Sequence, residues 1–290
     1  MKPFKVLDLF SGIGGFSLGL ERTGGFETVA FCEIEPFARK VLAKHWPKVP
    51  CYEDVRTLTG ELLRRDGISV DAITAGFPCQ DISLAGKRAG IGKGTRSGLW
   101  SEIIRLAGEL GPAIIVLENV SNLLSGPSGR PGGWFGQILG DLATLGYDAE
   151  WHCIPASALG APHQRDRTWI VAYANEDGLQ KREHVAGTGD KTPRSQQIRC
   201  AADRVSPSTV TAHADAGQLS LGRSIGRMGR LFESFPRDGN WKVASEPVLG
   251  RGADGIPNRV DRCGALGNAV VPQIPEIIGH AILTAIGRAA

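Results

Sequence analysis

The 290-residue sequence has little of what marks several large classes of protein. Its six cysteines include no Cys-x-x-Cys pair and are too few for a disulfide scaffold, so we expect reduced thiols that are mostly buried. No apolar run approaches the ~20 residues of a membrane helix. Asp8 interrupts the apolar start, so we expect no signal peptide, no membrane partner and a cytoplasmic location, associated with the nucleoid. Hydrophobic residues at 42% and charged residues at 22% exclude collagen, fibres and wholesale disorder.

A strong excess of one charge is also missing. The chain has 33 Lys and Arg against 30 Asp and Glu, a net charge of +3. Residues 175–262 hold 14 basic and 11 acidic side chains, which leaves 19 of each elsewhere, so the whole excess lies in this segment. A basic segment suits a polyanionic partner, but a solvated loop region would have a similar composition, so charge alone leaves the partner open.

Short apolar runs alternate with helical patterns over the first 173 residues, and the pattern of a helix returns near the end of the chain. We expect strands at Lys5–Leu9, Thr28–Glu33, Asp71–Ala75, Ala113–Glu118, Ala149–Ile154 and Thr168–Tyr173, the last two as a closing pair. We expect helices at Phe16–Thr23, Pro36–His45, Leu99–Leu110, Trp134–Leu145 and Ile274–Ile286. This alternation predicts an α/β fold with a mostly parallel sheet covered on both faces. Residues 175–262 are rich in Gly, Ser, Arg and Pro, which is typical of a small, loop-rich domain, with partial disorder as the alternative.

A glycine-rich turn follows the first expected strand. The run Asp8-Leu9-Phe10-Ser11-Gly12-Ile13-Gly14-Gly15 opens a helix, where free backbone amides favour an anionic group. Glu33 ends the second expected strand, at the place where nucleotide-binding α/β folds put an acid that binds ribose hydroxyls. A tight turn with no ligand is the alternative. The set of strand, glycines, helix and acid favours a nucleoside-containing cofactor, and the spacing disfavours a dinucleotide.

Three further segments place reactive or charged side chains near strand ends. Cys79 lies just beyond a predicted strand, at the edge where open α/β sheets bind ligands, although a buried structural thiol is the ordinary fate of such a residue. Residues Ser83–Gly98 follow it, with five glycines and four basic side chains, and suit a mobile lid. Glu118 ends another strand, where a ligand contact and a helix-capping role for the adjoining Asn119 remain equal alternatives. The run Gln164-Arg165-Asp166-Arg167 taken alone is typical of a solvated loop.

Taken together, these segments resemble the DNA cytosine-5 methyltransferase family, most closely its compact bacterial and phage members. The matching runs are DLFSGIGGFSLGL at 8–20, FCEIEPFA at 31–38, EDVR at 53–56, GFPCQDIS at 76–83, ENV at 118–120, QRDR at 164–167 and GNAVVPQ at 267–273. The resemblance implies a Rossmann-like fold with a mostly parallel seven-stranded sheet. It also divides the chain into a catalytic domain, residues 1–173 plus 264–290, and an inserted target-recognition domain at residues 174–263.

The resemblance implies a covalent mechanism in which a thiolate adds to carbon 6 of cytosine, so that carbon 5 becomes able to accept a methyl group. Cys79 matches the nucleophile, and Glu118 matches the acid that contacts ring nitrogen 3 and the exocyclic amine. Arg165 matches the guanidinium that holds the carbonyl at carbon 2, with Arg167 supporting it. The methyl donor implied is S-adenosylmethionine, with no metal.

The resemblance also assigns a cofactor pocket drawn from both ends of the chain. Glu33 would bind the ribose, Ile34 would pack on the adenine, and Asp54 would accept from its amino group. The other assigned residues are Phe10, Gly12, Gly14, Pro78, Asn268 and Val270.

Double-stranded DNA is the implied partner, with a cognate restriction endonuclease as a possible second one, and we expect a monomer. The target base must be flipped out of the duplex. Lys87, Arg88 and Arg96 would meet phosphates, with Arg227 and Arg230 as further DNA contacts.

The sequence departs from the family at residues 243–263, which do not fit the helix-forming motif expected there. Two rival functions remain open. A related tRNA methyltransferase would carry a Cys-Phe-Thr signature that is missing here, and a catalytically silent DNA-binding relative would not need Cys79, Glu118 and Arg165.

Overall fold

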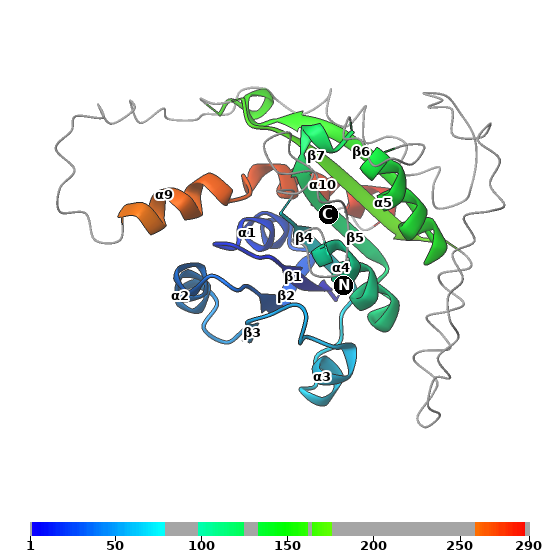
Figure 1. Cartoon of the computed structure of the whole chain (residues 1–290), viewed down its shortest axis with the longest axis horizontal. Coiled ribbons are helices and arrows are strands. Elements are labelled where there is room, and N and C mark those ends of the chain that lie inside the picture. Colours follow the sequence, from blue (N-terminus) through cyan, green and yellow to red (C-terminus); the bar gives the residue numbers. More distant parts are fainter. Residues whose placement is uncertain (1, 79–97, 125–132, 162–163, 176–258, 288–290) are drawn as a thin grey trace.

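A computed structural model of the chain describes residues 2–78, 98–124, 133–161, 164–175 and 259–287 (Figure 1). Its centre is a seven-stranded sheet with the order β3-β2-β1-β4-β5-β7-β6. The strands are β1 (Phe4–Leu9), β2 (Phe26–Cys32), β3 (Cys51–Tyr52), β4 (Ala72–Gly76), β5 (Ile114–Val120), β6 (Tyr147–Pro155) and β7 (Asp166–Ala174). Strands β1 to β5 run parallel, whereas β7 is antiparallel to both of its neighbours. The expected α/β fold and the pairing of the last two strands are thus confirmed.

Successive side chains along the central strands point to opposite faces of the sheet, so the core consists of two clusters, one on each face. Leu7 and Leu9 of β1 belong to one cluster, and Val6 belongs to the other. The central strands are almost wholly apolar because helices cover both faces, so neither set of side chains meets water. The polar exceptions Asp8 and Thr74 are fully buried and lie opposite each other in the register of β1 and β4.

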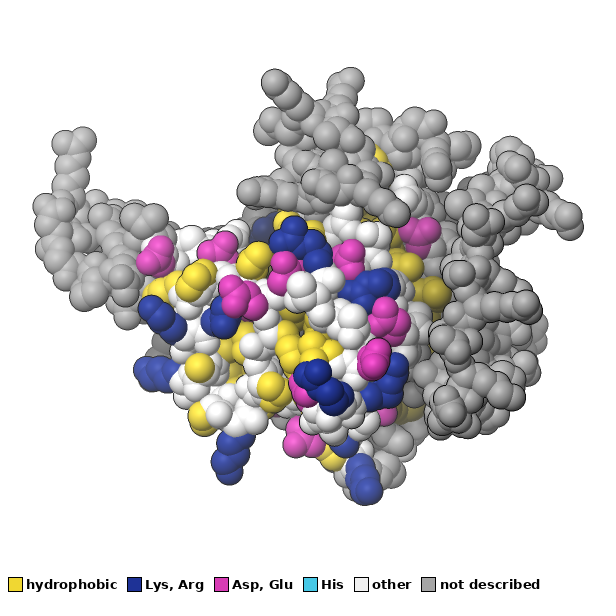
Figure 2. All heavy atoms as spheres, turned by 60° about the horizontal axis from the view of Figure 1, so that its bottom comes forward, with side chains coloured by type: hydrophobic (Ala, Val, Ile, Leu, Met, Phe, Trp, Pro, Cys, Tyr) yellow, Lys and Arg dark blue, Asp and Glu magenta, His cyan; other side chains and the backbone are white. Residues whose placement is uncertain are grey.

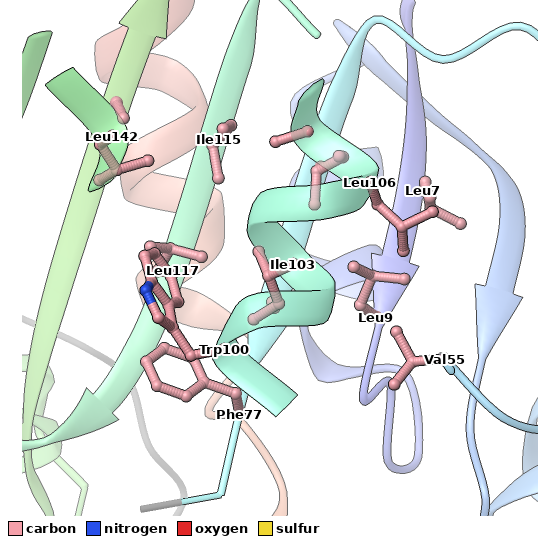
Figure 3. Packing of buried hydrophobic residues seen from close by; sticks show 14 of the residues in the cluster. Leu7, Leu9, Val55, Phe77, Trp100, Ile103, Leu106, Ile115, Leu117 and Leu142 are labelled. Carbon is pink, nitrogen blue, oxygen red and sulfur yellow. The ribbon is translucent and has the colours of Figure 1, made fainter. Parts of the chain in front are cut away.

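The first face is covered by α3 (Gly60–Arg65), α4 (Leu99–Leu110) and α5 (Gly133–Thr144). Figure 3 shows how α4 turns Trp100, Ile103 and Leu106 toward Leu9 and Leu117 of the sheet. These apolar positions recur at spacings of three residues along α4, so that one stripe of the helix is buried. The helix ends at Gly111, which adopts the left-handed conformation that glycine takes at low cost.

The opposite face is covered by α1 (Gly15–Arg22) and α10 (Gln273–Ala285), which come from the two ends of the chain. Ile274, Ile278 and Ile282 of α10 pack in the same cluster as Phe16 and Leu20 of α1. The two helices lie side by side in Figure 1, with α2 (Pro36–His45) near the far edge of the sheet and α9 (Arg259–Asn268) leading into α10. This packing places residues 270–272, which lead into α10, next to Gly15 and Gly19 of α1, directly after the glycine-rich turn.

The expected helices and longer strands all occur, with ends that differ by at most two residues. The sequence prediction missed β3, α3 and α9, together with the short 3-10 turns η2 (Ser121–Leu124) and η3 (Ala156–Leu159). Residues 243–263 do not fit the helix-forming motif of the family, yet α9 begins within this segment, at Arg259. None of the described side chains of α9 is buried, and Leu266 is 67% exposed, so this helix has no buried stripe that would signal it in the sequence.

Of the described cysteines, Cys32 is buried, Cys51 is half-buried and Cys153 is exposed, and all three are free thiols. The expectation of mostly buried thiols is therefore wrong for Cys153, which lies on the edge strand β6, where one side of the strand has no neighbour in the sheet.

Candidate active site

The glycine-rich turn between β1 and α1 is built from left-handed residues. Phe10, Gly12 and Gly14 all have positive φ, at 54°, 53° and 87°. Glycine takes this conformation freely, but for Phe10 it costs on the order of 1–3 kcal/mol. The turn is held by the Gly14 amide, which donates to the Ser11 carbonyl at 2.9 Å, and by the Ser11 amide, which donates to the Cys32 carbonyl of β2 at 3.3 Å. These two hydrogen bonds fix the backbone of the turn against the end of β2.

Asp8 of β1, which leads into this turn, links β1 to α1 and β4. Its carboxylate is fully buried and accepts hydrogen bonds from Ser17 Oγ of α1 at 2.8 Å and from Thr74 Oγ1 of β4 at 2.7 Å. Burial raises the pKa of Asp8 to about 7, and the nearby carboxylates of Glu33 and Glu21 raise it as well, while the two hydroxyl donors lower it. Sequence reasoning did not single out Asp8; an acidic residue in an otherwise apolar central strand was the available signal.

Glu33 follows β2 directly and faces the turn. One carboxylate oxygen accepts from the Gly12 amide at 2.7 Å, and the other accepts from the Glu35 amide at 2.8 Å. The side chain is buried, and these two backbone amides hold it beside the turn. Ile34, the next residue, is 54% exposed and offers an apolar surface at the same place.

Asp54 lies after the short strand β3, which extends the sheet beyond β2. Arg56 holds both of its carboxylate oxygens, with contacts of 2.7–3.0 Å, and this ion pair lowers the pKa of Asp54. The following turn is fastened to α4, because Arg105 donates to the carbonyls of Val55 at 3.0 Å and Leu58 at 2.8 Å. Arg105 is a second residue that sequence reasoning missed, since an arginine on a helix surface gives no signal of its own.

Glu118 lies near the carboxyl end of β5 and is nearly buried. Its Oε1 atom is 2.9 Å from Arg167 Nε on β7, and the side chains of the pair are 12% and 24% exposed. Burial raises the pKa of Glu118, while the charges of Arg167 and Arg165 act in the opposite direction. In the register, Glu118 pairs with Gly76 of β4, and a β-carbon placed at Gly76 would come 3.5 Å from Glu118 Oε2. The glycine thus leaves space beside the carboxylate.

Arg165 and Arg167 have different partners, although they stand two residues apart. Arg167 contacts Glu118, whereas Arg165 donates to the carbonyls of Gly267 and Ala269, both at 2.7 Å. The sequence assigned the leading role toward the base to Arg165 and a supporting role to Arg167. The geometry reverses this order of proximity to Glu118, because Arg167 lies within β7 whereas Arg165 precedes the strand and has a left-handed backbone with φ 41°.

Pro78 follows β4 at the same sheet edge and is half-buried. The residue before it, Phe77, is held through its carbonyl by Asn119 Nδ2 at 3.1 Å, and Asn119 Oδ1 accepts from the Val120 amide at 2.8 Å. Asn119 is buried and caps no helix, so its side chain instead fastens the end of β4 to the end of β5. The backbone that leads to residue 79 is thereby fixed.

The C-terminal segment reaches the same edge. A β-carbon at Gly76 would come 3.8 Å from Val270 Cγ2, and one at Gly15 would come 2.3 Å from the Val270 carbonyl oxygen. Val270 therefore lies between the glycine-rich turn and the Glu118 side of the site. Asn268 is exposed at the end of α9, two residues away.

Several residues singled out in the sequence lie outside the described residues. They are Cys79, Lys87, Arg88, Arg96, Arg227 and Arg230.

Both signs of charge occur together on one face of the described surface. Figure 2 shows the face that comes forward from the bottom of Figure 1, where Lys and Arg side chains are interspersed with Asp and Glu. Ion pairs such as Arg39–Glu53 at 2.9 Å and Arg65–Asp66 at 3.3 Å belong to this region of α2 and α3. The basic excess of the chain belongs to residues 175–262, most of which are not described.

Two kinds of feature are absent from the described ranges. None of those helices combines the length and apolar character that crossing a bilayer requires. Nor do His, Cys, Asp and Glu side chains gather there in threes in a way that would hold a metal ion.

Known proteins are similar to this chain in sequence or in fold. Type II methyltransferase M2.BsuMI of Bacillus subtilis (strain 168) is 37% identical over 177 residues, or 60% of this chain and 43% of that protein. Type II methyltransferase M.AluI of Cellulosimicrobium cellulans is 30% identical over 268 residues, or 89% of this chain and 48% of that protein. This chain thus spans less than half the length of these two relatives. The crystal structure of S. pombe Dnmt2 methyltransferase has the same fold, with a TM-score of 0.56 and 16% identity over 98% of this chain and 99% of that one.

The profile of one family covers most of the chain. The family is described as C-5 cytosine-specific DNA methylase, and its profile matches residues 4–246. The match includes the glycine-rich turn, Glu33 and Glu118. It also includes Arg167 of β7 and Arg165, which directly precedes that strand. The chain therefore belongs to the C-5 cytosine-specific DNA methylase family.

Proposed function

We propose that this chain is a DNA (cytosine-5-)-methyltransferase, which transfers a methyl group from S-adenosylmethionine to carbon 5 of a cytosine flipped out of a specific duplex sequence. Family membership supports this class of reaction. The observation that carries the proposal is the nearly buried pair of Glu118 and Arg167, beside Gly76 at the sheet edge. Cys79, the candidate nucleophile, follows Gly76 by three residues in the sequence and lies outside the described residues.

The residues around the glycine-rich turn fit an S-adenosylmethionine molecule. A β-carbon at Gly12 would meet nothing within 4 Å, so the turn has open space beside it, and the buried Glu33 carboxylate supplies acceptors next to that space. When bound, S-adenosylmethionine supplies a methyl group carried on a positively charged sulfur. Glu33 would bind the ribose hydroxyls, Ile34 would pack on the adenine, and Asp54 would accept from its amino group. The remaining contacts would come from Phe10, Gly12, Gly14, Pro78, Asn268 and Val270.

The chain's own groups would act on the base in a fixed order. The Cys79 thiolate adds to carbon 6 of the flipped cytosine, and the electron pair of the 5,6 double bond moves toward carbon 5 and the ring. Glu118 contacts ring nitrogen 3 and the exocyclic amine, and its raised pKa favours a carboxyl group that can share a proton with nitrogen 3. Carbon 5 then takes the methyl group, loses its proton, and the thiolate leaves as the double bond re-forms.

We assign the carbonyl at carbon 2 of the base to Arg167 rather than to Arg165. The Arg167 guanidinium already contacts the carboxylate that would hold the same base, whereas both donor arms of Arg165 are bonded to backbone carbonyls. A permanently charged, planar guanidinium suits a carbonyl that gains negative charge.

We further propose that residues 1–173 and 264–290 form the catalytic domain and residues 174–263 the target-recognition domain. The packing of α10 against α1 supports the joining of the two ends of the chain. Lys87, Arg88 and Arg96 would meet backbone phosphates, and Arg227 and Arg230 would contact DNA from the recognition domain. Such contacts should weaken as salt rises. We propose a cytoplasmic monomer, with a restriction endonuclease as a possible partner of the modification activity.

Methyl transfer from tritium-labelled S-adenosylmethionine to a mixed duplex DNA substrate tests the proposal directly. Wild-type protein should label DNA, and Cys79→Ser should abolish labelling while a gel-shift assay still detects DNA binding. Substantial labelling by Cys79→Ser would show that another group is the nucleophile. Labelling of tRNA in preference to DNA would point to the related tRNA enzymes, and binding without labelling of either would point to a silent relative.

A second experiment traps the covalent intermediate. DNA with 5-fluorocytosine in place of cytosine should form an adduct that survives denaturing electrophoresis in the presence of S-adenosylmethionine, because fluorine at carbon 5 cannot leave as a proton does. The target sequence must first be found by bisulfite sequencing of DNA from cells that express the protein. The absence of an adduct on that sequence would contradict the covalent mechanism.

A further inference from the structure

We propose that Arg165 is a positioning residue that fixes the C-terminal segment 267–270 against the cofactor side of the site. For its effect on S-adenosylmethionine, the inference rests on the proposed function. The guanidinium donates to the carbonyls of Gly267 and Ala269, each at 2.7 Å, across more than 100 residues of sequence. These two carbonyls flank Asn268, so one fork fixes the backbone on both sides of that residue.

The segment held by Arg165 fits only one place on α1. A β-carbon at Gly15 would come 2.3 Å from the Val270 carbonyl oxygen, and one at Gly19 would come 2.1 Å from the Pro272 carbonyl oxygen. The backbone of residues 270–272 therefore packs on a glycine surface with no side chains between. Val270 and Val271 also pack against the core cluster on this face, and the two Arg165 hydrogen bonds hold the residues just before them.

The backbone of Arg165 supports a specific role for its side chain. Its φ is 41°, a left-handed conformation that is costly for a residue with a side chain. The adjoining loop is anchored, since the Ala156 amide donates to the Gln164 carbonyl at 2.7 Å. The guanidinium is thus aimed at the segment from a rigid turn at the start of β7, while Arg167, two residues on, contacts Glu118. Arg165 therefore acts on the cofactor side of the site, and Arg167 acts on the side of the base.

The test compares Arg165→Ala, Arg165→Lys and Arg165→Gly in the full chain, with Arg22→Ala as a matched control. Arg22 also bridges the two ends of the chain, through an exposed ion pair with Glu276 at 3.2 Å, but lies away from the site. Glycine accepts the left-handed turn without strain, so any loss in Arg165→Gly comes from the missing guanidinium. Circular dichroism confirms that each variant is folded.

The first measurement is hydrogen–deuterium exchange without any ligand. Amides of residues 266–271 should exchange at least about tenfold faster in Arg165→Ala and Arg165→Gly, because two charge-assisted hydrogen bonds are lost. Arg165→Lys should fall between these variants and the wild type, and Arg22→Ala should match the wild type in this peptide. Unchanged exchange in Arg165→Ala and Arg165→Gly would overturn the proposal, whatever the protein's activity.

The second measurement separates the steps of the reaction. Arg165→Ala should raise the KM for S-adenosylmethionine by about tenfold or more with a smaller fall in kcat, whereas Arg167→Lys should lower kcat and leave that KM within about twofold. A fall in kcat alone in Arg165→Ala would overturn the proposal and assign Arg165 to the base. A wild-type protein that neither binds S-adenosylmethionine nor methylates DNA would contradict the proposed function, and the exchange experiment would still decide the role of Arg165.

Discussion

Replacing Asp8 by Asn should change how the stability of this protein depends on pH. Asn has nearly the same shape and can keep both contacts, because its oxygen accepts from one of the hydroxyls of Ser17 and Thr74 while its amide donates to the other. What the substitution removes is the ionisable group. The pKa of Asp8 rises from 3.8 to about 7 in the folded protein, mainly through burial.

The sign of the effect follows from proton binding. Between pH 4 and pH 7 the folded protein keeps a proton on Asp8 that the unfolded chain has released, so unfolding releases a proton and the free energy of unfolding falls as pH rises. The slope is about 1.4 kcal/mol per pH unit, which sums to about 4 kcal/mol over three units. The stabilisation linked to Asp8 is therefore fully present below pH 4 and is lost as pH rises through 7.

Urea denaturation at pH 5, 6, 7 and 8 measures this contribution as the difference between wild type and Asp8→Asn. The other titrating groups, including the nearby Glu33 and Glu21, are present in both proteins, so the difference should isolate Asp8. Relative to the variant, the wild type should lose about 2–3 kcal/mol between pH 5 and pH 7 and little more by pH 8. Ser17→Ala, which removes a hydroxyl that favours the ionised form, should keep a pH dependence of the same sign. A difference between wild type and Asp8→Asn that is constant over this range would refute the assignment of a raised pKa to Asp8.

Two further substitutions test the packing around the site. Gly19→Ala should destabilise the protein by about 1–3 kcal/mol in urea, since its β-carbon would lie 2.1 Å from the Pro272 carbonyl oxygen. Gly140→Ala is the control, because that helical position is open to solvent, and it should be neutral or stabilising by up to about 1 kcal/mol. An equal loss of stability in both variants would contradict the close approach of Gly19 to the Pro272 carbonyl. Arg105→Ala should lower the free energy of unfolding by about 2 kcal/mol, because it leaves two backbone carbonyls without their donor. The control Arg65→Ala, at an exposed ion pair, should lower it by less than about 1 kcal/mol. A reversed order would show that the Arg105 contacts do not stabilise the turn after β3.

Local patterns were sufficient for most of the architecture. The strands β1, β4 and β5 are short apolar runs bounded by polar or turn residues, and α4 carries a clear buried stripe. Both features arise because a two-sided layer of helices must bury the sheet completely. Elements without that requirement escaped prediction: β3 has two residues at the end of the sheet, and α9 is largely exposed.

The roles of some side chains could be predicted from local sequence, and those of others could not. Glu33 and Glu118 stand out in the sequence because each carboxylate comes at the end of an apolar strand, where the carboxyl edge of a parallel sheet collects ligands. The partners of Arg165 and Arg167 could not be read in this way. Their neighbours lie about 50 and 100 residues away in the chain, so only the assembled sheet and the returning C-terminal segment decide which guanidinium meets which group.

The sequence by itself determined the α/β class, the order of the main strands and helices along the chain, and the motifs of a cytosine-5 methylase. It could do so because periodicity, turn glycines and short motifs are local properties. Only the tertiary structure decided that Asp8 is a buried anchor, that Asn119 fastens two strand ends, and that Arg165 faces the C-terminal segment. Each of these depends on contacts between segments far apart in the chain, whose free energy exists only once the sheet has brought them together.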